Sequence, residues 1–112
     1  MVVEKQDFEM YQCEDKVICF DITDGDDNPK SLTGSNALWV VYSSLHSTNK
    51  IEKKSTDGEI TFNENEARVI LVPDDTKDLC GRFYHELRII LGDSSEVCAV
   101  GHIVINNSKT GS

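Results

Sequence analysis

The sequence has few basic residues, few aromatic residues and no long apolar run. It holds 11 Lys and Arg against 20 Asp and Glu, which gives a formal net charge of −9 with neutral His. Phosphate contacts need clustered cations, so this balance argues against nucleic-acid binding. No apolar run approaches the roughly 20 residues of a membrane span, and we expect no membrane association. Residues 1–7 lack a basic segment followed by an apolar one, so no signal peptide is expected.

Length and composition set the expected number of domains. The chain has 112 residues, of which 38% are hydrophobic. This length suffices for one domain and is too short for two. The hydrophobic fraction is too high for a disordered chain. We therefore expect a single domain over residues 1–106 and a flexible, polar C-terminal tail over residues 107–112.

No stretch is long and periodic enough for a substantial helix. Apolar and polar residues instead alternate in short runs that are separated by turn residues such as Asp, Asn and Gly. Only residues 74–81 suit a helical turn. The spacing predicts an all-β fold, an antiparallel β-sandwich of seven to eight strands. The expected strands span residues 7–12, 17–23, 36–43, 51–55, 59–62, 67–72, 82–91 and 96–105.

The alternation is clearest in the last two segments, which we expect to form a hairpin with a turn over residues 92–95. One face of this hairpin is apolar and should face the core. Its members are Phe83, His85, Leu87, Ile89 and Leu91 on the first strand and Val97, Ala99, Gly101, Ile103 and Ile105 on the second. If Leu91 pairs with Val97, then Glu86 lies opposite His102. Such a cross-strand charge pair on the outer face is worth roughly 0.2–1 kcal/mol.

Three other segments indicate where their strands lie in a sheet. Residues 36–43 are apolar on both faces, so we expect a central strand that is covered on both sides. Residues 51–55 carry two lysines, which are typical of an edge strand that resists pairing with another chain. The Asp57-Gly58 pair directly before residues 59–62 predicts a hairpin between these two segments.

The four cysteines leave three interpretations open. Zinc sites usually show closely spaced Cys or His pairs, whereas the nearest cysteines here have five residues between them. Two structural disulfides would suit an oxidising compartment. Free thiols that act as small apolar residues in a reducing compartment are the interpretation we favour. The four residues are Cys13, Cys19, Cys80 and Cys98.

An acidic turn over residues 24–29 is the one candidate for a cation site. Its first residues follow the start of an EF-hand loop, but position six is Pro29 instead of Gly and position twelve is Ser35 instead of Glu. A weak calcium site remains an alternative to a solvated turn whose side chains bond the local backbone. The oxygen-bearing residues are Asp21, Asp24, Asp26, Asp27 and Asn28.

The histidines do not form a recognisable catalytic motif. A general base needs a nucleophile and an orienting partner nearby, and neither is evident beside His46, His85 or His102. We expect His85 to be a semi-buried core residue and His102 a surface partner. Hydrolase, nucleotide-binding and metalloprotease motifs are missing from the sequence. We therefore expect no enzyme activity, no catalytic residues, no cofactor and no metal.

The final hairpin carries a family resemblance. Gly81-Arg82-Phe83-Tyr84-His85-Glu86-Leu87-Arg88-Ile89 is followed by a turn and a strand with Gly101 before its last apolar residues, and upstream Leu32-Thr33-Gly34 leads into the Trp39 segment. This order resembles the small immunoglobulin-like domains of tailed-bacteriophage virions, such as the N-terminal domain of baseplate upper proteins and related tail, neck and head-decoration modules. Two positions depart from immunoglobulin domains: Phe83 replaces a corner tyrosine, and His85 replaces the second bridging cysteine.

The resemblance implies a non-enzymatic structural component of a tail, baseplate or neck. Its partners would be other virion proteins, and it would be a monomer alone, present in many copies in a particle assembled in the host cytoplasm. A capsid head-decoration protein is one alternative. A carbohydrate- or cell-surface-binding β-sandwich module is another, and it requires exposed aromatics on one face. The phenols Tyr11, Tyr42 and Tyr84 are not clustered in the sequence.

Overall fold

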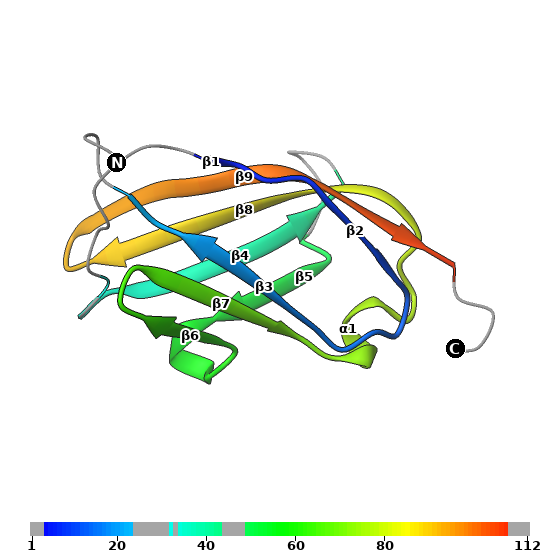
Figure 1. Cartoon of the computed structure of the whole chain (residues 1–112), viewed down its shortest axis with the longest axis horizontal. Helices are drawn as coiled ribbons and strands as arrows, with labels where there is room; N and C mark the ends of the chain where they lie inside the picture. Colours follow the sequence, from blue (N-terminus) through cyan, green and yellow to red (C-terminus); the bar gives the residue numbers. More distant parts are fainter. Residues whose placement is uncertain (1–3, 24–31, 33, 44–48, 108–112) are drawn as a thin grey trace.

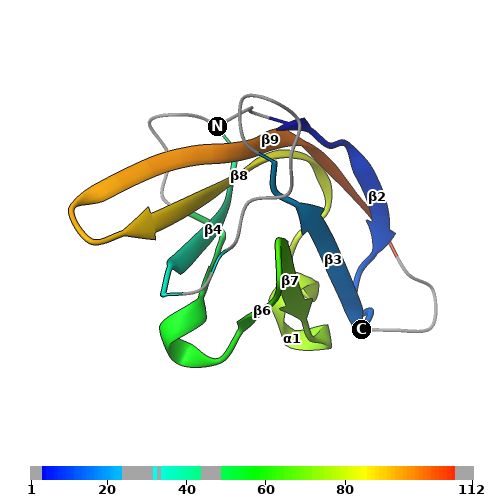
Figure 2. The same ribbon diagram turned by 60° about the vertical axis from the view of Figure 1, so that its left-hand side comes forward.

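The computed structural model describes residues 4–23, 32, 34–43 and 49–107, which form two packed β-sheets (Figure 1). The six-stranded sheet has the order β1-β9-β8-β4-β5, with β2 also paired to β9, and the three-stranded sheet has the order β3-β7-β6. Figure 2 shows the two layers from the side. The strands are β1 (Glu4–Lys5), β2 (Phe8–Tyr11), β3 (Lys16–Asp21), β4 (Asn36–Tyr42), β5 (Ile51–Lys54), β6 (Ile60–Asn63), β7 (Glu66–Leu71), β8 (Gly81–Leu91) and β9 (Ser94–Asn106).

The pairing order confirms the predicted immunoglobulin-like sandwich. In an immunoglobulin domain, strands C, F and G lie in one sheet, and strands B, E and D lie side by side in the other. Here β4, β8 and β9 lie side by side in the larger sheet, and β3, β7 and β6 form the smaller one. The sandwich buries Trp39 of β4 completely, as expected for a core tryptophan.

The N-terminal strands do not follow the antiparallel prediction. Both β1 and β2 run parallel to β9, with Glu4 opposite Ala99 and Phe8 opposite Ile103. Between them the Gln6 amide donates a hydrogen bond to the Val100 carbonyl at 2.8 Å. The two short strands therefore extend one ladder along a single edge of β9 (Figure 1).

Glycine at position 101 permits this close approach. A Cβ atom there would lie 2.0 Å from the Gln6 carbonyl oxygen, which is far inside contact distance. Gly101 has no side chain, so the connection between β1 and β2 can lie against β9 at this point.

The hairpin of β8 and β9 forms as predicted, but with a different register. Leu91 pairs with Ser94, so the turn is the two-residue Gly92-Asp93 connection, shorter than the four-residue turn expected. The ladder then shifts between Leu87 and Arg88, and Cys98 is the extra residue of a β-bulge.

This register and its bulge correct several predicted side-chain positions, among them Val97, which lies opposite Arg88 and is half-buried instead of facing the core. His102 lies opposite Tyr84, whereas Glu86 lies opposite Val100, so the predicted Glu86–His102 pair is wrong. The bulge turns Cys98 into the core, where only 1% of its surface is exposed. Leu91 is 52% exposed at the end of the strand, instead of facing the core as predicted.

The Asp57-Gly58 signal marks a change of sheet instead of a hairpin. A short 3-10 helix, η1 (Ser55–Asp57), follows β5, and Gly58 adopts a left-handed conformation with φ of 75°. The chain then enters β6, which pairs with β7 in the other sheet. A glycine at positive φ suits both kinds of turn, so the sequence signal did not separate them.

Strand β4 is central, but only one of its faces is buried. Ala37, Trp39 and Val41 are buried against the second sheet, while Leu38 and Val40 are half-buried on the outer face. The prediction of cover on both sides is therefore wrong. The prediction for β5 is confirmed, because among the described residues β5 pairs with β4 alone and ends the sheet.

One of the two β5 lysines points inward. The Lys53 side chain is 6% exposed, and its Nζ lies 2.8 Å from Asp75 Oδ2 and 3.2 Å from Glu59 Oε2. Burial lowers the pKa of Lys53, but its hydrogen bonds to Asp75 and Glu59 and their negative charges raise it overall. Asp75 belongs to α1 (Pro73–Thr76), the helical turn, which begins and ends earlier than predicted.

The core is continuous between the two sheets. It includes the predicted hairpin face from Phe83 to Ile89 and, on β9, Ala99, Ile103 and Ile105. The other buried apolar residues are Met10, Ile18, Phe20, Ile22, Leu32, Ala37, Trp39, Val41, Ile51, Ile60, Ala67, Val69, Leu71 and Cys98.

Candidate functional site

A buried histidine connects the core to the N-terminal segment. The His85 side chain on β8 has no solvent exposure. The Trp39 indole N–H donates a hydrogen bond to His85 Nδ1 at 3.2 Å. Because Nδ1 accepts, the neutral ring carries its proton on Nε2, which donates to the Gln6 carbonyl at 2.5 Å. His85 is therefore hydrogen-bonded through one ring nitrogen to Trp39 on β4 and through the other to the backbone of Gln6.

The surroundings of His85 explain its charge state. Burial lowers the pKa of His85, and this outweighs the Gln6 carbonyl and the Asp7 charge, which act in the opposite direction. The ring also packs on Phe8, Phe20 and Trp39, with ring centroids 5.3, 6.0 and 5.8 Å away. The prediction of a core histidine is confirmed, and burial is complete where partial burial was expected.

The outer face of the larger sheet carries a row of three rings. Tyr42, Tyr84 and His102 lie directly opposite one another on β4, β8 and β9. The two tyrosine rings are stacked, with centroids 5.8 Å apart and an interplanar angle of 27°. The Tyr84 and His102 centroids are 4.9 Å apart with the rings tilted by 52°. We call these three residues the aromatic row.

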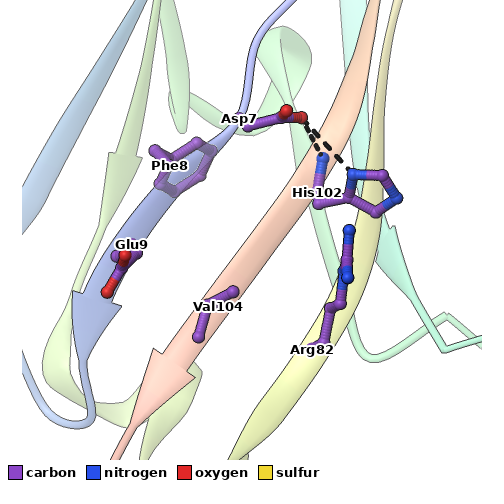
Figure 3. A pocket seen from close by; sticks show the side chains of 6 residues that line it. All are labelled: Asp7, Phe8, Glu9, Arg82, His102 and Val104. Atoms are coloured by element: carbon purple, nitrogen blue, oxygen red, sulfur yellow. Dashed lines mark hydrogen bonds and ion pairs between the residues drawn. The ribbon is translucent and has the colours of Figure 1, made fainter.

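Asp7 extends the aromatic row beyond β9. Its carboxylate accepts a hydrogen bond from the backbone N–H of His102 at 2.9 Å and lies 3.5 Å from His102 Nδ1. Figure 3 shows this carboxylate beside His102, joined by dashed lines to its backbone nitrogen and its ring nitrogen. The backbone hydrogen bond is the main reason that the pKa of Asp7 is lowered. His102 is therefore a surface partner as predicted, but its partner is Asp7 instead of Glu86.

Two shallow pockets adjoin the aromatic row and share His102. One, of about 200 Å³, includes Lys5, Tyr42, Tyr84 and Val100 in its lining. The other, of about 230 Å³, lies on the far side of His102 and is lined by Asp7, Phe8, Glu9, Arg82 and Val104 (Figure 3). Both pockets are lined by polar and apolar side chains, and the lining of the pocket beside Lys5 is mainly apolar.

The Tyr42 hydroxyl is a hydrogen-bond donor over the physiological pH range. Burial raises the pKa of Tyr42, and the charge of Glu86 and the neighbouring Tyr84 add to the effect. A neutral phenol offers one donor and can also accept. The pocket beside Lys5 therefore combines flat ring surface with at least two donors.

The structure describes the four cysteines but not the turn that was predicted as a candidate cation site. Asp24 to Asn28 lie outside the described residues, as do His46 and most of the predicted tail. Within residues 4–23, 32, 34–43 and 49–107, no three His, Cys, Asp or Glu side chains come together as a metal site. The four cysteines are all described, and none is in a disulfide. Their redox state in solution stays a prediction.

No helix in the described part of the chain is long and apolar enough to span a membrane.

Sequence analysis missed the aromatic row because its members are far apart in the chain. Tyr42 and Tyr84 are separated by 42 positions, and only the register of β4 on β8 brings them together. Tyr11, the third phenol, lies opposite Asn106 near the end of β9, away from the row.

No family model matches the sequence, and neither does any curated protein. The fold defines the chain as an all-β sandwich of two packed sheets.

Proposed function

We propose that this chain is a non-enzymatic structural module of a tailed-bacteriophage virion that acts through protein–protein contacts. The observation that carries the proposal is the final hairpin. The segment from Gly81 to Ile89, on which the resemblance rests, pairs with the strand that contains Gly101 inside an immunoglobulin-like sandwich. The segment that carries the resemblance therefore lies in a β-sandwich, the kind of fold that the resemblance implies.

The surface of the molecule supports a role in assembly. The net charge of −9 keeps copies apart in solution and favours a partner with a basic surface. The Lys54 side chain is exposed on the β5 edge, where a charge opposes open-ended strand pairing. A small module of this kind binds weakly as one copy and gains strength from many copies in a symmetric particle.

The test is the protein composition of purified particles. Virions from the source of the sequence would be purified, separated into heads and tails, and analysed by mass spectrometry. We expect peptides of this chain in the tail, baseplate or neck fraction, at a constant ratio to the other structural proteins. A replication protein of the same source is the control for contamination.

The same experiment separates the alternative of head decoration. Peptides found with the heads, together with binding of the purified protein to empty heads, would favour a capsid head-decoration protein. Absence of the chain from washed particles, at a sensitivity that detects minor tail proteins, would overturn the virion proposal.

A further inference from the structure

We propose that the open edge of β3 (Lys16–Asp21) is a docking site for an extended segment of a neighbouring protein, which adds to the smaller sheet as a further strand. The segment has small apolar or hydroxyl-bearing residues in its middle and a lysine or arginine at each end. This inference rests on the assembly role proposed above and deepens it, because it names the surface through which the module holds a partner.

The first support is the missing neighbour of β3. A constant-type immunoglobulin domain has four strands in the corresponding sheet, with its first strand beside its second. Here β1 and β2 both pair with β9 of the larger sheet. Among the described residues, β3 has β7 as its one neighbouring strand and lies at the border of the smaller sheet (Figure 1). The place of a first strand beside β3 is therefore open in this part of the chain.

The second support is the direction of the β3 backbone groups. The Ile22 amide donates a hydrogen bond to the carbonyl of Asn65, the residue before β7, at 2.9 Å. Bonded positions alternate along an antiparallel ladder, so every second residue of β3 also bonds β7. The residues between them turn their N–H and C=O groups to the open edge. These residues are Val17, Cys19 and Asp21.

One side chain already bonds to this edge. The Gln6 side chain donates a hydrogen bond from Nε2 to the Cys19 carbonyl at 3.3 Å, which shows that this carbonyl points away from β7. The Gln6 amide group occupies the position that an N–H of an added strand would take. A docked segment would replace this single long hydrogen bond by a regular ladder.

The third support is the apolar character of the edge. Val17 is 54% exposed, and Ile70, directly opposite on β7, is 36% exposed. Cys19 is exposed as well, so the middle of β3 presents no charge to solvent. The edge strand β5 instead exposes Glu52 and Lys54, and the edge strand β6 exposes Thr61 and Asn63. β3 thus lacks the charges that discourage strand pairing and offers apolar contacts to an added strand.

Charge at the two ends of β3 selects the occupant. Asp15 precedes the strand, Asp21 ends it, and both are exposed, whereas Lys16 is half-buried. A segment with a cation near each end therefore meets opposite charges. A second copy of this chain is disfavoured, because each copy has a net charge of −9 and would bring the same carboxylates to the contact.

An edge strand can also simply be the end of a sheet. In that case its outward amides exchange quickly with solvent whether or not a partner is present. Docking predicts rapid exchange in the free chain and slow exchange in the complex. The two roles are therefore separated by amide exchange at the outward residues.

The experiment is a titration of the full ¹⁵N-labelled chain, in reducing buffer, with the capped peptide Lys-Val-Thr-Val-Thr-Val-Lys. We expect a Kd on the order of 1 mM, with signal shifts centred on β3. At a peptide concentration about ten times the Kd, exchange of the Val17, Cys19 and Asp21 amides should slow about tenfold. The amides of Ile18 and Phe20, which already bond β7, are the internal control. The peptide with glutamate in place of both lysines should bind about fivefold more weakly or worse.

A pair of variants at one position tests the backbone contact. Cys19→Pro removes an N–H that points to the open edge and leaves the ladder to β7 intact, because proline is tolerated where an edge strand faces solvent. This variant should lose peptide binding at least about tenfold, whereas Cys19→Val keeps the N–H and should bind like the wild type. If the proline variant does not fold, Val17→Lys decides, since a lysine on the edge should weaken binding about fivefold or more.

Four results would overturn the proposal. They are no shift at β3, slow exchange of the three outward amides in the free chain, binding that Cys19→Pro retains, and wild-type dimers that pair through β3. The particle analysis described above fails separately. A chain found in particles that does not bind the peptide keeps its assembly role without this surface. A chain that binds the peptide but is absent from particles keeps the docking edge without a virion partner.

Discussion

At the residue scale, His85 lies where the resemblance to immunoglobulin domains implies the second bridging cysteine of antibody domains. A disulfide there would join the two sheets covalently. His85 instead packs on Phe20 of the opposite sheet and bonds Trp39 and Gln6 through its two nitrogens. A polar ring that is fully buried is tolerated because each of its nitrogens has a partner. The core at this point therefore depends on the neutral form of one side chain.

This dependence predicts a loss of stability in mild acid. Burial holds the pKa of His85 below its ordinary value of 6.5, so the unfolded chain binds the proton more readily than the folded one. The contribution is fully present above pH 6.5 and decreases as the pH falls through and below that value. Denaturant unfolding from about pH 8 to about pH 5 should show a slope of at most about 1.4 kcal/mol per pH unit from this group.

The His85→Gln variant is the matched control for the acid effect, since glutamine has a donor and an acceptor but does not titrate. It should be less stable at neutral pH and should lose this part of the slope. The lowered pKa of Asp7 acts in a separate window, because its effect is lost only below about pH 3.8. A wild-type slope that the variant reproduces between pH 6.5 and 5 would contradict the role given to His85.

The sequence could predict that His85 is buried, but not what it contacts. Its place in the alternation of residues 82–91 puts it on the core face. Its bond to Gln6 joins positions 79 apart, and no local pattern encodes such a contact. The aromatic row was missed for the same reason, because register between distant strands decides which side chains meet.

At the scale of elements, the attachment of β1 and β2 depends on the bare backbone at Gly101. A Gly101→Ala substitution places a methyl group against the Gln6 carbonyl, so either the N-terminal segment or β9 must move. We expect a loss of roughly 1–3 kcal/mol in the free energy of unfolding, the usual range for overpacking. Denaturant unfolding measures this loss, and amide hydrogen exchange locates it.

Hydrogen exchange distinguishes local from general damage in this variant. Amides of Phe8 to Tyr11 should exchange faster, while those of β3 and β7 in the other sheet should keep their relative protection. Val100→Ala, at the neighbouring position, removes volume without a clash and is the control. An alanine at 101 that leaves the exchange of β2 unchanged would show that the close approach is not required.

Element boundaries were predictable where alternation was strong, and less so where a single residue changed the geometry. Alternation identified β2 to β9, including the long hairpin, but it missed the two-residue strand β1. It did not reveal the bulge at Cys98, since one inserted residue shifts the phase without a distinctive residue type. It also did not reveal that β1 and β2 run parallel to β9, because strand direction follows from the path of the chain and not from local pattern.

At the scale of the whole molecule, we expect the charged edge of β5 to limit association between copies. Glu52 and Lys54 are its exposed side chains, and in the described part of the chain β5 has a neighbouring strand on one side only. The wild-type chain should sediment as a monomer at micromolar concentration. Replacing both residues by valine should produce dimers or larger species, because the charges that discourage strand pairing are lost.

A matched double substitution away from the edge controls for added hydrophobicity. Glu66→Val with Arg68→Val removes one charge of each sign, as the β5 variant does, and places two valines on the outer face of β7, the central strand of the smaller sheet. We expect this variant to sediment closer to the monomer than the β5 variant. Equal association of both variants, or a tight wild-type dimer, would contradict the claim that the charges on β5 prevent strand pairing between copies.

The direction of the N-terminal strands also determines how the molecule resists a pulling force. Because β1 and β2 point the same way as β9, tension between the start of β1 and the end of β9 slides these neighbours lengthwise. The rungs that join them, from Gln6 to Gln12, then share the strain and must rupture together. Antiparallel neighbours such as β4 and β5, pulled apart at one end, yield rung by rung. The sandwich should therefore need a much larger force when it is pulled between the start of β1 and the end of β9 than when β5 is pulled away from β4 at one end.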